Sequence, residues 1–151
     1  MTIEVFTGYR RARNEFLKKD EAMTEFKTVS ELGLKVFYRE AGEPGGPKLV
    51  LLGGFPSSSH QFRNLIPALA DRFHLVSFDY PGFENTELPD PASWEYTFDH
   101  LADVAEAAME GIEFTGGMGF YMQDYGSDWK PTDRQAPRVA RLASNPERQR
   151  L

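Results

Sequence analysis

The stretch Gly119-Phe120-Tyr121-Met122-Gln123-Asp124-Tyr125-Gly126 places one acid at the end of an apolar run that favours a β-strand. A strand that turns sharply into a helix projects its turn residue out of the sheet, and the N–H groups that open the helix can stabilise an anion there. The pattern therefore predicts that Asp124 occupies a nucleophile position. The alternative interpretation is an acid that only caps a helix at the end of a strand.

Composition limits the classes of protein that this chain can represent. Its 151 residues are 40% hydrophobic and 26% charged, which suits one hydrophobic core. Mean hydropathy is -0.50, and no apolar run approaches the roughly 20 residues of a membrane helix, so we expect a cytoplasmic protein without a membrane segment. A net charge of -6 argues against nucleic-acid partners and leaves a small uncharged or weakly polar substrate open.

Cysteine is absent, which removes disulfides, thiolate metal sites and cysteine nucleophiles together. No other pattern predicts a metal site or a cofactor. Residues 8–23 mix basic side chains with a few apolar ones at helical spacing. This pattern predicts a solvated helical extension over residues 1–25, with a partner-binding arm as the alternative. Residues 26–151 are predicted to form the core domain.

From Phe26 onward the pattern is that of an α/β protein. Residues 26–30 and 34–40 resemble an antiparallel hairpin with a turn at Leu32-Gly33. Strand and helix then alternate, and the apolar run at 49–52 is typical of a parallel strand buried on both faces. The expected elements after the hairpin are strands at 49–52, 73–78 and 120–123 and helices at 58–69 and 98–111.

The two expected helices have recognisable start signals or apolar stripes. Ser58 and Gln61 form a capping-box pattern at the start of the first helix, and Pro67 should kink or interrupt it. The second helix is predicted by apolar residues at helical spacing, namely Phe98, Leu101, Val104, Ala105 and Ala108.

Four segments in order, at 37–42, 51–59, 79–83 and 123–126, resemble the N-terminal half of an α/β-hydrolase. The most similar branch is the haloalkane dehalogenase and epoxide hydrolase group, whose nucleophile is an aspartate. The resemblance covers roughly residues 26–126. It implies a partial hydrolase sheet, with an N-terminal antiparallel hairpin followed by parallel strands and flanking helices, and with the C-terminal half absent.

By this resemblance Asp124 would attack an alkyl carbon of an epoxide or haloalkane, and water would then cleave the covalent ester. The oxyanion donors would be the backbone N–H groups of Phe55 and Tyr125. The Phe55-Pro56 peptide bond could be cis.

The chain departs from the family pattern at specific points. Gly53-Gly54 replaces the usual His-Gly, which would leave a more flexible loop, and Glu84 replaces a glycine after Phe83. Met122 stands where a smaller residue is usual. After Gly126, residues 127–131 end in a proline, and a helical pattern resumes only at 136–143, so an insertion would separate the turn from its helix.

All three histidines, His60, His74 and His100, precede Asp124, whereas the family's catalytic base and second acid would lie beyond Leu151. His60 is predicted to be an exposed first-turn side chain, with a substitute base as the alternative, and His74 and His100 are expected to be structural. Three further acids, Asp79, Asp99 and Asp103, are interpreted as turn or solvated-face residues. Turnover by this chain alone is therefore not expected.

Two classes of function follow. One is a hydrolase of the aspartate-nucleophile type that acts on a small molecule only when another segment supplies the base. The other is a non-catalytic remnant or interaction domain, in which the strand before Asp124 is an uncovered sheet edge and promotes homo-oligomers. An altered sequence derived from the family would also explain the substitutions, without predicting activity.

Overall fold

The computed structural model describes residues 23–124, which form one mixed sheet with helices on both faces. The strand order is β1-β2-β4-β3-β5. In chain order the elements are β1 (Glu25–Glu31), β2 (Leu34–Ala41), β3 (Lys48–Leu52), the 3-10 helix η1 (Ser59–Phe62), α2 (Leu65–Leu69), β4 (His74–Phe78), α3 (Phe98–Gly111) and β5 (Met118–Met122).

The predicted hairpin is confirmed. β1 and β2 pair antiparallel, with Val29 opposite Val36. Leu32 and Gly33 both have positive φ, 51° and 77°, as a two-residue hairpin turn that follows the strand twist requires. The same hairpin joins the rest of the sheet through β2, which runs antiparallel to β4.

The parallel part of the sheet is formed by β4, β3 and β5, with β3 between the other two. Leu51 and Leu52 are both almost fully buried but belong to separate core clusters on opposite faces of the sheet. This burial confirms the interpretation of 49–52 as a strand covered on both sides. Within the described residues, β5 pairs with β3 alone and forms the sheet edge.

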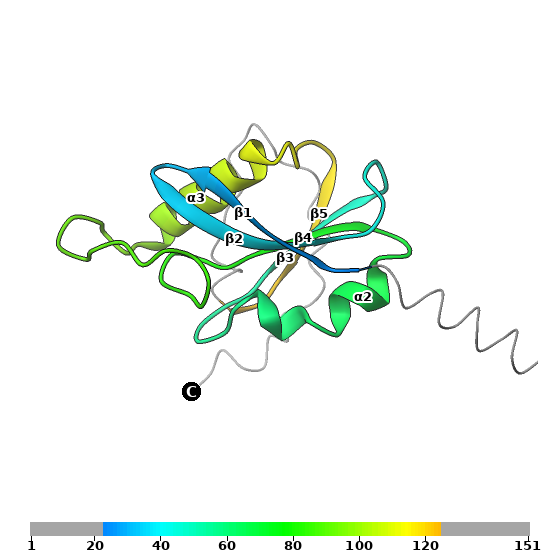
Figure 1. The fold of residues 1–151 in the computed structure, drawn as a ribbon, viewed down its shortest axis with the longest axis horizontal. Coiled ribbons are helices and arrows are strands. Elements are labelled where there is room, and N and C mark those ends of the chain that lie inside the picture. The colour runs from blue at the N-terminus through cyan, green and yellow to red at the C-terminus, as the bar shows by residue number, and fades with distance from the viewer. Residues whose placement is uncertain (1–22, 125–151) are drawn as a thin grey trace, which may run out of the picture.

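The helices form a layer on each face of the sheet, with α3 and α2 on opposite sides (Figure 1). α3 begins after Thr97, whose side chain accepts a hydrogen bond from the His100 N–H, and it buries Val104, Ala108 and Met109 against the sheet. The bounds predicted for α3 are confirmed. On the other face Ile66 is 1% exposed, and burial of such a side chain contributes roughly 1.5–3 kcal/mol.

The continuous helix predicted at 58–69 is wrong. The segment divides into η1 and α2, and Ser58 caps η1 by accepting from the His60 N–H. Pro67 is the third residue of α2 and lies in its first turn. N–H groups in the first turn have no acceptor within the helix, so the missing N–H of proline costs no helical hydrogen bond there. The break therefore precedes the proline.

Several predictions fall outside the described residues. They are the helical extension before residue 23, the oxyanion donor Tyr125, the inserted segment at 127–131 and the helix at 136–143. None of the helices within residues 23–124 is long and apolar enough to cross a membrane.

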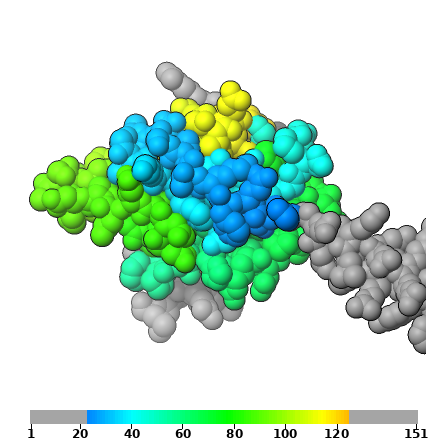
Figure 2. Space-filling model, in the orientation of Figure 1, coloured from blue at the N-terminus to red at the C-terminus, as the bar shows by residue number. Residues whose placement is uncertain are grey.

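The loop between β4 and α3 projects from the body of the molecule, at the left of Figure 2.

Candidate active site

Asp124 lies two residues beyond the end of β5, with a backbone φ of +53°. This left-handed conformation is uncommon for a residue with a β-carbon, and such residues gather at functional turns. The Gln123 N–H still bonds to the Leu52 carbonyl at 3.0 Å, so the sheet holds the chain up to the residue before the turn. Met122 is half-buried against the core cluster, which accommodates its larger side chain.

The loop after β3 approaches Asp124 directly. The Phe55 N–H donates a hydrogen bond of 2.9 Å to Asp124 Oδ2. A β-carbon added to Gly54 would lie 2.7 Å from Asp124 Cγ and closer still to other atoms of that side chain, so only glycine permits this approach. The Phe55-Pro56 bond is cis, as the resemblance implies. The structure thus brings together Phe55 and Asp124, which are 69 residues apart in the sequence.

Gly53 has a different neighbour, the side chain of Gln61. A β-carbon at Gly53 would lie 3.2 Å from Gln61 Cδ and would overlap its amide nitrogen. That nitrogen is buried without a hydrogen-bond partner among the described residues. The Gln61 side chain therefore fills the space beside Gly53, and no reciprocal capping bond from it to Ser58 is recorded in this part of the chain. The loop is packed against Gln61 at this point.

Asp79 is a buried acid that links three segments. The prediction that it lies on a solvated face is therefore wrong, although it does follow a strand at a turn. Its side chain follows β4 and is 1% exposed. Oδ1 accepts from the Ser59 N–H at 2.7 Å, and Oδ2 accepts from the Asn85 backbone and side-chain amides at 3.3 and 3.1 Å. Its carbonyl accepts from the Thr86 hydroxyl at 2.7 Å. Asp99 and Asp103 are exposed on α3, as expected.

Arg39 is also buried, although it shares a face of β2 with the exposed Lys35. Its Nε donates to Ser59 Oγ at 2.9 Å, and its guanidinium lies 3.5 Å from His60 Nδ1. Since arginine can only donate, this contact favours the His60 tautomer with the proton on Nε2. Ser59 therefore joins Arg39 to Asp79 below the loop that carries Phe55.

Each histidine has contacts away from Asp124. His60 is exposed, as predicted, and contacts Arg39. His74 is buried, with Nε2 2.6 Å from Glu40 Oε1 and its ring against Phe114. His100 Nδ1 lies 2.7 Å from the Glu95 carbonyl. The contacts of His74 and His100 agree with structural roles.

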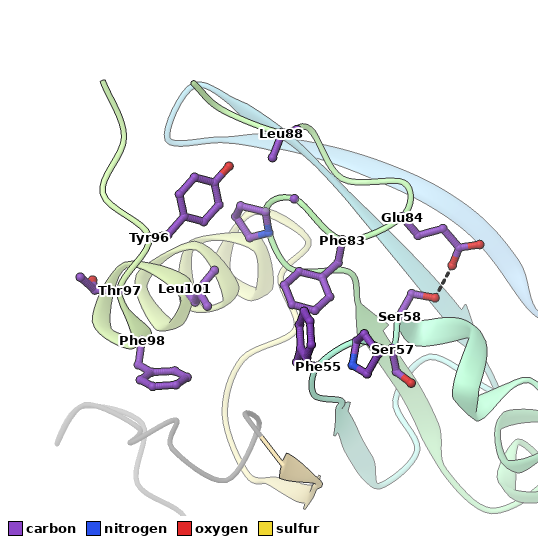
Figure 3. Close-up of a pocket in the computed structure, with 13 residues that line it drawn as sticks. Phe55, Ser57, Ser58, Phe83, Glu84, Leu88, Tyr96, Thr97, Phe98 and Leu101 are labelled. Carbon is purple, nitrogen blue, oxygen red and sulfur yellow. Dashed lines mark hydrogen bonds between the residues drawn. The ribbon is translucent and has the colours of Figure 1, made fainter. Parts of the chain in front are cut away.

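A pocket of about 780 Å³ opens beside Phe55 (Figure 3). Phe55 and Phe83 meet edge to face at its centre, with ring centroids 6.3 Å apart, and the start of α3 forms the opposite wall. Its size is that of a small-molecule site. The lining residues are Phe55, Pro56, Ser57, Ser58, Pro81, Gly82, Phe83, Glu84, Leu88, Tyr96, Thr97, Phe98 and Leu101.

Two pocket residues differ from their interpretation in the sequence. Phe98, assigned to the apolar stripe of α3, is 48% exposed and lines the pocket. The sequence offered one signal for this exposure: Phe98 directly follows the capping Thr97. It is therefore the first residue of the helix, which extends beyond the part of the stripe that packs on the sheet. Glu84 lies in the turn after Phe83 with φ of +33°, the conformation that favours glycine, and accepts a hydrogen bond from Ser58 Oγ.

No group of three histidine, cysteine or acidic side chains within residues 23–124 is placed to hold a metal ion. The site consists instead of a carboxylate at a strained turn, a backbone N–H aimed at it and an apolar pocket beside that N–H.

Comparison with known proteins agrees with the observed fold. Residues 47–115 match the family model described as alpha/beta hydrolase fold. The match places these residues within an α/β-hydrolase fold. A haloalkane dehalogenase variant from Bradyrhizobium elkanii superposes with a TM-score of 0.63 and 27% identity, over 70% of this chain and 34% of that one. An epoxide hydrolase from Vigna radiata gives a TM-score of 0.63 and 31% identity, over 70% and 33%.

Among curated proteins, an uncharacterized hydrolase of Saccharomyces cerevisiae is 44% identical over 95 residues, which is 63% of this chain. The chain spans 32% of the length of that yeast relative. The described residues thus form part of an α/β-hydrolase fold, hydrolase-like in sequence, with epoxide hydrolases and haloalkane dehalogenases among its relatives.

Proposed function

We propose that this α/β-hydrolase chain provides the nucleophile part of an aspartate-dependent hydrolase that acts on epoxides or haloalkanes. The observation that carries the proposal is the 2.9 Å hydrogen bond from the Phe55 N–H to Asp124 Oδ2, at a residue with φ of +53°. Relatives named as epoxide hydrolase and haloalkane dehalogenase support the same chemistry.

In the first step an Asp124 carboxylate oxygen forms a bond to an electrophilic carbon. In a haloalkane the carbon–halogen bond breaks and halide leaves with the electron pair. In an epoxide a carbon–oxygen bond breaks and the resulting alkoxide takes a proton from water. Both routes give an alkyl ester of Asp124.

In the second step water would attack the ester carbonyl carbon, and negative charge would develop on the carbonyl oxygen. The Phe55 N–H is a candidate donor to that oxygen, because it already bonds to the carboxylate. The resemblance suggests the Tyr125 N–H as the second donor. Release of the alcohol would return Asp124 to its starting form.

The second step needs a base to activate the water, and the contacts of the three histidines in the chain do not place one at Asp124. The chain alone should therefore accumulate the ester without turning over. A base supplied by another segment would complete the cycle.

The test is incubation of the full chain with a reactive alkyl bromide or with styrene oxide, followed by peptide mass spectrometry. We expect one added alkyl group on Asp124, no label at that position in Asp124→Asn, and no product beyond the buffer rate. Label distributed evenly over surface acids would contradict the nucleophile assignment. Product formation lost in His60→Ala would identify His60 as the base.

A second candidate is an interaction domain that self-associates, and it is favoured by the position of β5. In the described part of the chain this strand pairs on one side with β3 and leaves its other side as the sheet edge. Unpaired strand edges promote pairing with another chain.

Gel filtration with light scattering between about 1 and 100 μM distinguishes this candidate. Dimers or larger species that disappear when Met122 is replaced by proline would support pairing through β5. The neighbouring Gln123 N–H bonds to Leu52 on β3, so the Met122 N–H faces the outer edge, where proline removes a donor. A monomer at every concentration would exclude it.

A further inference from the structure

The pocket beside Phe55 contains one charged group that the proposed hydrolysis does not use. Among the described residues that line it, Glu84 alone is charged, and lysine, arginine and histidine do not line it. Glu84 is exposed, and the Ser58 hydroxyl donates to Oε2, which leaves its other carboxylate oxygen without a recorded partner in this region. Figure 3 shows the carboxylate of Glu84 directed toward Ser58 at one side of the pocket.

Aromatic rings make up much of the remaining wall. Phe55 and Phe83 meet edge to face, and the buried Tyr80 packs against Phe83, with ring centroids 6.0 Å apart. Across the pocket, the Tyr96 hydroxyl donates to the Pro89 carbonyl at 2.8 Å, so its ring is held in place. Aromatic faces and a carboxylate both attract a cation, whereas an anion in the same pocket would be repelled.

We propose that this pocket selects a cationic ligand with an apolar or aromatic body, and that Glu84 is its counter-charge. The ammonium of a hydrophobic amine would lie near the Glu84 carboxylate, and its apolar part would lie between Phe83 and the first turn of α3. As a statement of substrate class this rests on the proposed function, but binding itself does not require the chemistry of Asp124.

The test compares three ligands of nearly equal size by isothermal calorimetry on the full chain. They are 4-phenylbutylamine, 4-phenylbutan-1-ol and 4-phenylbutyrate, which are cationic, neutral and anionic at neutral pH. We expect the amine to bind about fivefold more tightly than the alcohol and the acid to bind most weakly, as for a partly exposed charge pair. About 0.5 M NaCl should reduce the preference.

Glu84→Gln removes the charge and retains an oxygen for the Ser58 hydrogen bond. In this variant the amine and the alcohol should bind within about twofold of each other. Glu87→Gln is the matched control, because Glu87 is an exposed acid on the same loop that does not line the pocket, and this variant should keep the preference.

Equal binding of amine and alcohol to the unsubstituted chain would overturn the proposal, as would a preference that survives in Glu84→Gln. If the preference is lost in Asp124→Asn and kept in Glu84→Gln, the counter-charge is Asp124, and this result would also overturn the proposal. If Asp124 fails to alkylate while the Glu84-dependent preference holds, the proposed function fails and the binding proposal stands.

Discussion

Asp79 shows how one buried carboxylate organises the candidate site without being its nucleophile. It accepts hydrogen bonds from Ser59, next to the loop that carries Phe55, and from Asn85, next to Glu84. Its partners thus belong to the two loops that form the centre of the pocket. A buried acceptor with three donors stabilises those loops only while it keeps its acceptor character.

Asp79→Asn should therefore destabilise the protein by about 2–3 kcal/mol. The substitution replaces one carboxylate oxygen, which accepts hydrogen bonds, with an NH2 group, which donates them, opposite the Asn85 donors. Chemical denaturation followed by circular dichroism measures this change. Asp103→Asn, on the exposed face of α3, is the control and should stay within about 0.5 kcal/mol. Equal effects of the two variants would contradict the assigned role of Asp79.

Sequence patterns predicted local structure where the causes are local. The bounds of α3 could be read from the sequence because its apolar stripe lies within the helix, and Thr97 supplies its cap. Helix continuity at 58–69 could not be read, because Gln61 packs beside Gly53, across the loop, instead of capping Ser58. The burial of Arg39 and Asp79 was equally hidden, since Ser59, which contacts both, lies 20 residues from each.

At the level of the element, α3 depends on its cap and carries part of the pocket wall. Thr97→Ala removes the acceptor for the His100 N–H and should cost about 1 kcal/mol of folding free energy. Thermal unfolding measures the loss. Ser93→Ala, in the preceding loop, removes a 3.2 Å bond to the Asp90 carbonyl on an exposed residue and should have a smaller effect. A larger loss in the control would contradict this account of α3.

Three strands meet at Glu40, and this junction predicts a dependence of stability on pH. Burial alone would raise the pKa of Glu40, but hydrogen bonds from Lys27 on β1 and His74 on β4 outweigh it and hold the pKa below its ordinary value. A carboxyl with a lowered folded-state pKa stabilises the fold above its unfolded pKa, and the contribution is lost as the pH falls through the folded value.

The unsubstituted protein should consequently lose more stability between about pH 5 and pH 3 than Glu40→Gln does. Urea unfolding at each pH measures the difference, with Glu43→Gln, an exposed loop acid, as the control. Identical pH profiles for Glu40→Gln and the unsubstituted protein would contradict the prediction, because they would show that Glu40 does not contribute to the pH dependence of stability.

At the level of the whole molecule, the sheet brings together two loops 69 residues apart in sequence, those of Phe55 and Asp124. The family motifs indicated both residues, but their contact depends on β3 and β5 pairing in parallel, with Leu52 opposite Met122. The roles of Glu84 and Phe98 in the pocket wall depend on loop packing that local sequence does not encode.

The central claim is that the approach of Gly54 to Asp124 creates a nucleophile position, and covalent labelling of two glycine variants tests it most directly. In Gly54→Ala the new β-carbon would overlap the Asp124 side chain, whereas in Gly119→Ala it would meet Leu49 Cδ1 at an ordinary 3.5 Å. With folding of both variants checked by circular dichroism, alkylation of Asp124 should fall about a hundredfold in Gly54→Ala and persist in Gly119→Ala. Equal labelling of Asp124 in the two folded variants would contradict the account.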